Sequence, residues 1–344
     1  GVRLVGSEMC IRDRENIKMK KKLLKGLVVS SLLCASLLTG CSSSNDQVVI
    51  YSNADDEAVT AMKNALDKNG YEGQYLFQTF GTSELGGKLL AEGTNIEADL
   101  VTMSSFYLDS AQEQKKMFVD LDFDTQALDE YPSYYTPITS QEGAIIINTE
   151  ELKANSLETP TCLKDLAKPE YKDMISVTDI ASSSTAWLLI QALVSEYGED
   201  GAKEVLKGIY DNAGAHIEDS GSGPIKKVRA GEVAIGFGLR HQAVRDKADE
   251  LPIDFVDPTE GNFSLTESVA VVNKDGSEHQ KLAMKMAQCI IESGRKELLE
   301  TYPNPLYQGE TSDSANKSAY PKTFSEKLTA ELLEKHQKLS EECK

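Results

Sequence analysis

Several residue types that carry catalysis or bind metals are scarce in this chain. Gly221-Ser222-Gly223 lacks the residues of a nucleophile elbow or a Walker loop, and no serine has a base that the sequence assigns to it. The four histidines match no metal-ligand spacing: His216, His241, His279 and His336. The sequence therefore indicates a protein that is not an enzyme and that holds no metal or cofactor.

Cysteines are also few for a chain of this length. Six are present, but Cys10 and Cys34 precede an expected cleavage site and Cys41 is expected to carry a lipid. The remaining three lie far apart and share no metal-ligand spacing: Cys162, Cys289 and Cys343. This usage excludes a disulfide scaffold.

Basic residues are outnumbered throughout the expected mature chain. After residue 40 the sequence holds 28 Lys or Arg and 52 Asp or Glu, a formal charge of about −24. Such a chain is not expected to bind nucleic acid. The same charge repels an anionic ligand at long range, so capture of an anion has to depend on local groups.

A long hydrophobic run occurs only near the start of the chain. Lysines follow Met19, and Gly26 to Leu38 is almost entirely apolar or small, which is typical of a signal peptide over 19–40. The run is shorter than the roughly 20 residues of a membrane span. Leu38-Thr39-Gly40-Cys41 resembles the lipobox of bacterial lipoproteins, in which Cys41 is acylated. The alternative is an ordinary secretory peptide with a chance cysteine.

The residues on either side of this leader have different characters. Residues 41–46 include three serines and form an expected polar tether between the lipid and the folded part. Residues 1–18 precede the start-like methionine and are interpreted as a probable non-native extension. Sequencing the mature N-terminus would reject that interpretation if these residues were found.

No linker rich in Pro, Gly or Ser divides the rest of the chain, and no repeat is evident. Apolar β-branched runs alternate with segments of helical spacing, beginning with a strand at Val48 to Ser52 and a helix over Ala58 to Leu66. Repeated strand–helix units favour an α/β fold with a mostly parallel sheet. Two lobes that share strands would explain the missing linker.

Small hydroxyl and Gly residues recur where a predicted strand meets a helix. Free backbone N–H groups at a helix start, with hydroxyls beside them, can hold a phosphate, phosphonate or carboxylate. The alternative for any one of them is an ordinary helix N-cap. The candidates are Ser52, Asn53, Thr82, Ser83, Ser104, Ser105, Ser183, Ser184, Thr185 and Ser222.

Three charged or titratable residues complete the candidate ligand-binding set. Arg240 and His241 follow a predicted strand, where a guanidinium could grip two ligand oxygens. A surface ion pair is the alternative for both. Glu267 flanks the last predicted crossing and could accept from a ligand ammonium group, or it could be a solvated acid.

These segments resemble the family 1 extracellular solute-binding proteins, in the branch that contains ferric-ion and 2-aminoethylphosphonate binders. The resemblance covers about Val48 to Tyr307. The residues that carry it are Val49-Ile50-Tyr51-Ser52, Gly81-Thr82-Ser83-Glu84-Leu85, Ala98-Asp99-Leu100-Val101, Ser182-Ser183-Ser184-Thr185 and Val228-Arg229-Ala230-Gly231-Glu232-Val233-Ala234-Ile235-Gly236.

The resemblance implies an α/β, two-lobed type II periplasmic-binding-protein fold with a hinge and an inter-lobe ligand cleft. Residues 47–141 plus 262–300 would form lobe 1, 142–261 lobe 2, and 301–344 a C-terminal helical segment. Ferric members have two adjacent tyrosines after the strand corresponding to Glu232 to Gly236. This chain has Gly238-Leu239-Arg240-His241 there, which argues against direct ferric binding.

The sequence thus predicts a monomeric, lipid-anchored, extracytoplasmic subunit of an ABC importer. It would capture a small-molecule oxyanion such as 2-aminoethylphosphonate and deliver it to the permease subunits in the membrane. The first alternative is a ferric-ion or ferric-chelate binder. The second is an exported hydrolase that uses Ser222 or Ser183, which the missing catalytic motifs disfavour.

Overall fold

The computed structural model describes residues 47–344. The expected extension at 1–18, the leader at 19–40, the lipid site at Cys41 and the tether at 41–46 lie outside the described residues. Residues 47–344 belong to one compact unit. No helix within that range combines the length and the apolar character needed to cross a bilayer.

Ten strands of the described chain form one connected sheet. They are β1 (Val48–Ser52), β2 (Tyr75–Thr79), β3 (Leu100–Ser104), β4 (Tyr135–Asn148), β5 (Ile175–Thr178), β6 (Ile217–Glu218), β7 (Ile235–Leu239), β8 (Ile253–Val256), β9 (Asn262–Val271) and β10 (Pro321–Lys322). Their spatial order is β2-β1-β3-β9-β4-β7-β5-β6, with β10 beside β9 and β8 beside β4. The long strands β4 and β9 thus connect a β2-β1-β3 group to a β7-β5-β6 group.

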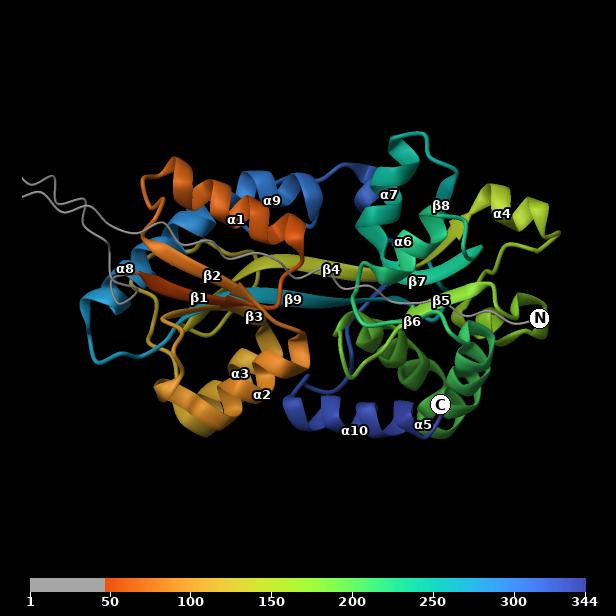
Figure 1. The fold of residues 1–344 in the computed structure, drawn as a ribbon, viewed down its shortest axis with the longest axis horizontal. Helices are drawn as coiled ribbons and strands as arrows, with labels where there is room; N and C mark the ends of the chain where they lie inside the picture. Colours follow the sequence, from red (N-terminus) through yellow and green to blue (C-terminus); the bar gives the residue numbers. More distant parts are fainter. Residues whose placement is uncertain (1–46) are drawn as a thin grey trace, which may run out of the picture. The chain divides into compact units, whose positions relative to one another are not determined.

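Helices cover both faces of this sheet (Figure 1). They are α1 (Asp56–Lys68), α2 (Thr82–Glu92), α3 (Ser105–Lys115), α4 (Thr149–Ala154), α5 (Thr185–Ala213), α6 (Gly223–Arg229), α7 (Arg240–Ala248), α8 (Glu278–Cys289), α9 (Arg295–Thr301) and α10 (Ala330–Glu341). In Figure 1, α1, α9, α6 and α7 lie above the strands, and α2, α3, α5 and α10 lie below them.

The first strand–helix unit shows how local sequence sets these elements. Every residue of β1 is buried, as expected for an apolar strand that is covered on both faces. Asp55 then ends the turn, and its Oδ1 accepts a hydrogen bond of 3.1 Å from the backbone N–H of Ala58. This cap satisfies one free donor of α1, which begins one residue later.

The sheet is mixed, whereas the sequence predicts a mostly parallel one. β1 pairs in parallel with β2 and β3, and β5 pairs in parallel with β6 and β7. The crossing strands are antiparallel to each other and to their neighbours β3, β7 and β8. The strand–helix units therefore occur on either side of the crossing pair, which the unit pattern alone does not reveal.

Helix α7 was not foreseen, and it changes the position expected for Arg240 and His241. These residues occupy the first turn of α7, not a loop after the strand. A second difference concerns α5. The spacing of apolar residues predicts two helices, over Ala186 to Tyr197 and Ala202 to Tyr210, but α5 runs through both over 29 residues with a kink at Gly198, where φ is 68°. Glycine adopts this left-handed value without the steric cost that a Cβ would bring.

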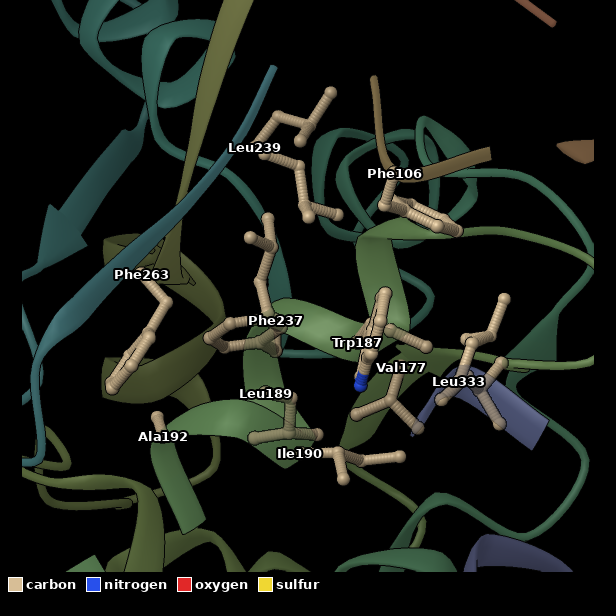
Figure 2. Close-up of a cluster of buried hydrophobic side chains, with 14 of the residues drawn as sticks. Phe106, Val177, Trp187, Leu189, Ile190, Ala192, Phe237, Leu239, Phe263 and Leu333 are labelled. Atoms are coloured by element: carbon tan, nitrogen blue, oxygen red, sulfur yellow. The ribbon is translucent and has the colours of Figure 1, made fainter. Parts of the chain in front are cut away.

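The largest hydrophobic core spans both strand groups. Figure 2 shows Trp187 of α5 at the centre of this cluster, near Phe106 of α3. Their ring centroids lie 4.9 Å apart in an edge-on arrangement. The Trp187 Nε1–H also donates a 2.7 Å hydrogen bond to Nδ1 of His336 in α10. Helix α10 therefore packs into the core that joins the two groups.

Candidate functional site

A pocket of about 380 Å³ lies where the two strand groups face each other. One side, here called the acidic wall, follows β1 and β2 and includes part of β9. Its polar residues are Asn53, Asp55, Thr82, Glu84 and Glu267. The opposite side, the hydroxyl wall, precedes α5 and α6. It consists of Ser182, Ser183, Ser184, Thr185, Asp219, Ser220, Gly221 and Ser222.

Asn53 and Glu267 form the centre of the acidic wall. The Asn53 Nδ2 donates to Thr82 Oγ1 at 3.0 Å and to Glu267 Oε1 at 3.3 Å. The hydroxyl of Ser104 donates to the same Glu267 oxygen at 2.8 Å. The buried atoms Oε2 of Glu267 and Oδ1 of Asn53 have no hydrogen-bond partner. Two residues of the acidic wall therefore each hold a buried acceptor without a hydrogen-bond donor.

The position of Glu267 in the sheet explains its burial. It lies on β9, between Ser104 of β3 and Thr139 of β4, and its exposed fraction is only 7%. Burial raises the pKa of Glu267 to about 7, opposed by the hydrogen bonds from Ser104 and Asn53. A carboxyl group of this kind changes its charge near neutral pH.

The hydroxyl wall lies at the start of α5. Ser184 occupies the N-cap position, but its side chain makes no capping hydrogen bond. The Thr185 N–H donates to Ser183 Oγ over a long 3.4 Å. Across the pocket, the N-cap of α2 is Gly81, which has no side chain to cap that helix. The first N–H groups of α5 are satisfied within this turn, because Ala186 and Trp187 donate to the carbonyls of Ser183 and Ser184. What both helix starts bring to the pocket is the partial positive charge of the helix dipole.

The charged side chains that line the pocket are all acidic. They are Asp55, Glu84, Asp219 and Glu267, and the lining contains no Lys, Arg or His. Asp55 is held in place, because its Oδ1 accepts from the Ala58 N–H and from the hydroxyl of Tyr302. The pocket thus combines neutral donors with negative charge.

Seven of the thirteen predicted ligand-binding residues line this pocket. They are Asn53, Thr82, Ser183, Ser184, Thr185, Ser222 and Glu267. The structure brings them together from five separate segments of the chain. The remaining six do not line it: Ser52, Ser83, Ser104, Ser105, Arg240 and His241.

The excluded serines hold the backbone or support the lining residues. Ser52 Oγ accepts from the Ala54 N–H at 3.0 Å. Ser105 Oγ donates to the carbonyl of Thr266 at 3.0 Å. Ser83 accepts from Gln337 of α10 at 3.2 Å. Ser104 acts on the pocket indirectly, through its bond to Glu267.

Arg240 is placed away from the pocket, against expectation. Its Nε and Nη2 donate to Asp257 at 2.7 and 3.1 Å. The carbonyls of Ala315 and Lys317 accept from its Nη1 and Nη2 at 3.1 and 3.2 Å. The guanidinium also lies 4.5 Å over the ring of Phe255. These partners take four of the five N–H donors of Arg240, and the residue does not line the pocket.

His241 is likewise absent from the pocket. Its ring packs 4.8 Å from the ring of Tyr302, and burial together with Arg245 lowers the pKa of His241 to about 3. A neutral imidazole at this position contributes to packing and offers no positive charge to an anion.

Sequence reasoning missed several lining residues. Asp55 is the N-cap of α1 and Glu84 lies in the first turn of α2, so in the sequence both resemble ordinary acids of a helix start. Gln141 was missed because the apolar run Gly143 to Asn148 predicts a strand that begins only after it, whereas β4 begins at Tyr135. Phe80 and Leu239 supply apolar lining that no motif marks.

The described residues also bear on catalysis and metal binding. Across residues 47–344, no three His, Cys, Asp or Glu side chains are grouped so as to hold a metal ion. Ser183 and Ser222 line a pocket that contains no His or Lys to act as their base. The three cysteines of this range, Cys162, Cys289 and Cys343, are free.

Comparison with solved structures identifies the fold class. The chain superposes on the periplasmic binding protein AfuA of Actinobacillus pleuropneumoniae, with fructose-6-phosphate bound, at a TM-score of 0.67 and 22% identity. The match covers 78% of this chain and 88% of that one. Iron-bound HitA of Pseudomonas aeruginosa superposes with a TM-score of 0.67 and 20% identity. That match covers 86% of this chain and 99% of HitA. The protein therefore has the two-lobed, type II periplasmic-binding-protein fold, with the pocket between its lobes.

Sequence comparison identifies the family. The profile described as "Bacterial extracellular solute-binding protein" matches residues 93–324, and the chain belongs to this family. The spermidine/putrescine-binding periplasmic protein of Salmonella typhimurium is 24% identical over 314 residues, 83% of this chain and 85% of that one. The protein is thus an extracytoplasmic solute-binding protein of the ABC-importer type, and its relatives are binding proteins, not enzymes.

Proposed function

We propose that this protein captures a small zwitterion that carries both an oxyanion and an amino group, such as 2-aminoethylphosphonate, and delivers it to a membrane permease. The observation that carries the proposal is the pocket itself, in which a hydroxyl wall of neutral donors faces an acidic wall with two unpartnered acceptors. One ligand with opposite charges at its two ends satisfies both walls.

The oxyanion would bind at the hydroxyl wall. Ser183, Thr185 and Ser222 offer hydroxyl groups at the starts of α5 and α6, and the dipole of the long helix α5 adds partial positive charge at its start. Neutral donors at a helix start can hold an anion without a basic side chain. With Arg240 occupied elsewhere, the proposal differs from the sequence-based prediction, in which a guanidinium holds the oxyanion.

The amino group would bind at the acidic wall. A simple oxyanion would meet four carboxyl groups in the pocket and no basic side chain, which is unfavourable in a partly desolvated site. An ammonium group near Glu267 offsets this repulsion and donates to the free acceptors. The pocket therefore favours an amino-bearing anion over phosphate or an unsubstituted phosphonate.

A diamine is a second candidate, favoured by the same acidic lining. The relative from Salmonella is named for spermidine and putrescine, and two ammonium groups could bind between Glu267 and Asp219, which lie on opposite walls. A ferric chelate is the third candidate. A bare ferric ion is disfavoured because no Tyr or His lines the pocket.

The setting of the protein is part of the proposal. The lipobox-like Leu38-Thr39-Gly40-Cys41 supports a lipid anchor at Cys41 after removal of the signal peptide. A monomer tethered by residues 41–46 could then reach the permease at the membrane surface. Mass spectrometry of the membrane fraction would show an acylated N-terminal cysteine, and a free mature N-terminus would contradict the anchor.

A thermal-shift screen of the full-length protein in detergent tests the ligand class. Its panel contains 2-aminoethylphosphonate, ethylphosphonate, phosphate, putrescine and ferric citrate. A ligand at a hundredfold excess over Kd stabilises the folded state by about 2.7 kcal/mol. We expect 2-aminoethylphosphonate to exceed ethylphosphonate. A shift with ethylphosphonate or phosphate alone would contradict the zwitterion, and a shift with ferric citrate alone would favour the chelate.

A further inference from the structure

Among the buried acids of residues 47–344, Glu267 differs in having an oxygen without a hydrogen-bond partner on a side chain that lines the ligand pocket. Asp246 accepts from Arg229 through both carboxylate oxygens, and Glu260 accepts from two backbone N–H groups and from Tyr197. Glu267 Oε2 has no partner at all. The fold therefore satisfies its structural acids and leaves one half-satisfied at the ligand site.

We infer that Glu267, together with Asn53, selects a solute that carries an ammonium group, and that binding of this group expels a proton from Glu267. The inference rests on the proposed function, since it concerns the same pocket. In the bound state, ammonium N–H groups would donate to Glu267 Oε2 and Asn53 Oδ1, the two acceptors without partners.

The groups around Glu267 explain why its proton is held when the pocket is empty. Asp55 at the start of α1, Glu84 in α2 and Asp219 on the opposite wall line the same pocket, and all are acidic. Its sheet neighbours Ser104 and Thr139 are neutral. No lining group is cationic, so a negative charge on Glu267 is opposed by burial and by its neighbours.

A ligand cation reverses this balance. An ammonium group beside Oε2 stabilises the carboxylate, so the O–H bond of the carboxyl breaks and its proton leaves to solvent. Asn53 holds the geometry, because its Nδ2 fixes Oε1 while its Oδ1 remains free to accept. Neutral or purely anionic solutes offer no such compensation, so the same residue discriminates against them.

The linkage has a defined direction. Burial raises the pKa of Glu267 to about 7 in the empty pocket, and the bound ammonium lowers it. Binding therefore releases protons below pH 7, and affinity rises with pH until Glu267 is ionised in the free protein. For a free pKa of about 7, Kd falls about tenfold between pH 6 and pH 8, with about 0.9 proton released at pH 6 and about 0.1 at pH 8.

Calorimetric titration of the full-length protein in detergent tests this inference. 2-Aminoethylphosphonate is titrated at pH 6 and pH 8 in two buffers with different ionisation enthalpies, into wild type and Glu267→Gln. The phosphonate itself titrates near pH 6, so the result is the difference between the two proteins. We expect wild type to show a tenfold larger change in Kd and to release about one more proton at pH 6.

Glu142→Gln is the matched control. Glu142 lies on β4, where burial raises its pKa, but it accepts from Ser318 and does not line the pocket. This variant should release protons as wild type does. If wild type and Glu267→Gln both bind the ligand and release the same number of protons, only the inference of proton release from Glu267 is overturned. If neither 2-aminoethylphosphonate nor putrescine binds wild type at either pH, the proposed function fails and the inference with it.

A second measurement does not depend on the folding of any variant. Infrared difference spectra of wild type at pH 6 should lose the band of a protonated carboxylic acid when 2-aminoethylphosphonate is added. A difference spectrum without that loss, under conditions in which calorimetry shows binding, would overturn the inference.

Discussion

Arg240 and Glu267 are two buried charged residues that the sequence assigns to one ligand site, and the structure gives them opposite environments. Arg240 is 4% exposed, and its donors reach Asp257 and two backbone carbonyls. Glu267 is 7% exposed, and one of its oxygens has no partner. Burial alone therefore does not distinguish a charged residue that stabilises the fold from one that binds ligand. The two are distinguished by whether their hydrogen-bonding groups have partners within the protein.

The difference also assigns roles to the two regions. The region of Arg240 joins α7 to the segment after β8 and to the chain near Ala315, and its charges cancel within the fold. The pocket around Glu267 is left with excess negative charge and free acceptors. We expect the first region to control stability and the second to control binding.

The largest effect should come from breaking the satisfied pair. Arg240→Ala leaves Asp257, whose side chain is 10% exposed, without its cationic partner, and we expect this to cost about 3–5 kcal/mol of unfolding free energy. Denaturant unfolding measures this loss, and Kd for 2-aminoethylphosphonate should stay within about twofold. Lys68→Ala, which breaks an exposed pair with Glu297, is the control and should cost less than about 1 kcal/mol. If the Arg240→Ala protein is as stable as wild type but does not bind the ligand, Arg240 is a ligand-binding residue and the comparison is wrong.

Removing the unsatisfied charge should stabilise the empty protein. The pKa of Glu267 is raised from 4.5 to about 7 in the folded state, so its contribution is present below pH 4.5 and is lost as pH rises through 7. Glutamine does not ionise, so the Glu267→Gln protein does not lose this stability as pH rises. Relative to wild type, its unfolding free energy should therefore improve by about 3 kcal/mol between pH 4 and pH 8. Parallel pH profiles of the two proteins would contradict this.

The hydrogen bond between Trp187 and His336 is a buried, neutral and satisfied pair, and it extends the comparison with Glu267 to acid pH. His336→Phe removes the acceptor of the Trp187 Nε1–H and leaves a buried donor unpaired, which should cost about 1–3 kcal/mol at pH 7. Burial lowers the pKa of His336 to about 4, so the histidine's contribution is present above pH 6.5 and is lost as pH falls through 4. The cost of the substitution, measured by denaturant unfolding, should shrink in acid, and a constant cost would argue against a buried neutral imidazole.

The smallest effects should separate serines that line the pocket from those that do not. Ser183→Ala removes a lining hydroxyl and should raise Kd about 2- to 10-fold, the equivalent of one neutral hydrogen bond. Ser105→Ala removes bonds to Thr266 and Ser268 outside the pocket and should leave Kd unchanged. Calorimetry on both variants measures the difference, and equal effects would contradict the assignment of the hydroxyl wall.

Much of the fold could be predicted because the strands and helices in the first half of the chain have clear local sequence patterns. The strand at Val48–Ser52 has the residue range that its apolar β-branched run predicts. The crossing strand β4 was found only from Gly143 onward, because its first half is polar and contains Pro137. Its strand character comes from pairing with β9, which is a tertiary effect that local propensity does not contain.

The sequence predicts the lining residues that stand at strand ends or helix starts. It does not predict the role of residues that depends on hydrogen-bond partners far away in the sequence. Asn53, Thr82 and Ser183 line the pocket because they follow strands or precede helices, as the sequence indicates. Arg240 was misplaced because its partner Asp257 lies beyond β8 and its carbonyl acceptors lie more than 70 residues away. A residue's free hydrogen-bonding capacity is visible only once the long-range contacts are known.

A crystal structure of the full-length protein with 2-aminoethylphosphonate would test the central claim most directly. We predict the ligand nitrogen at about 2.7–3.2 Å from Glu267 Oε2 and Asn53 Oδ1, with the phosphonate oxygens against Ser183, Thr185 and the first turn of α5. A phosphonate group beside Glu267, or a ligand held by Arg240 outside the pocket, would contradict it.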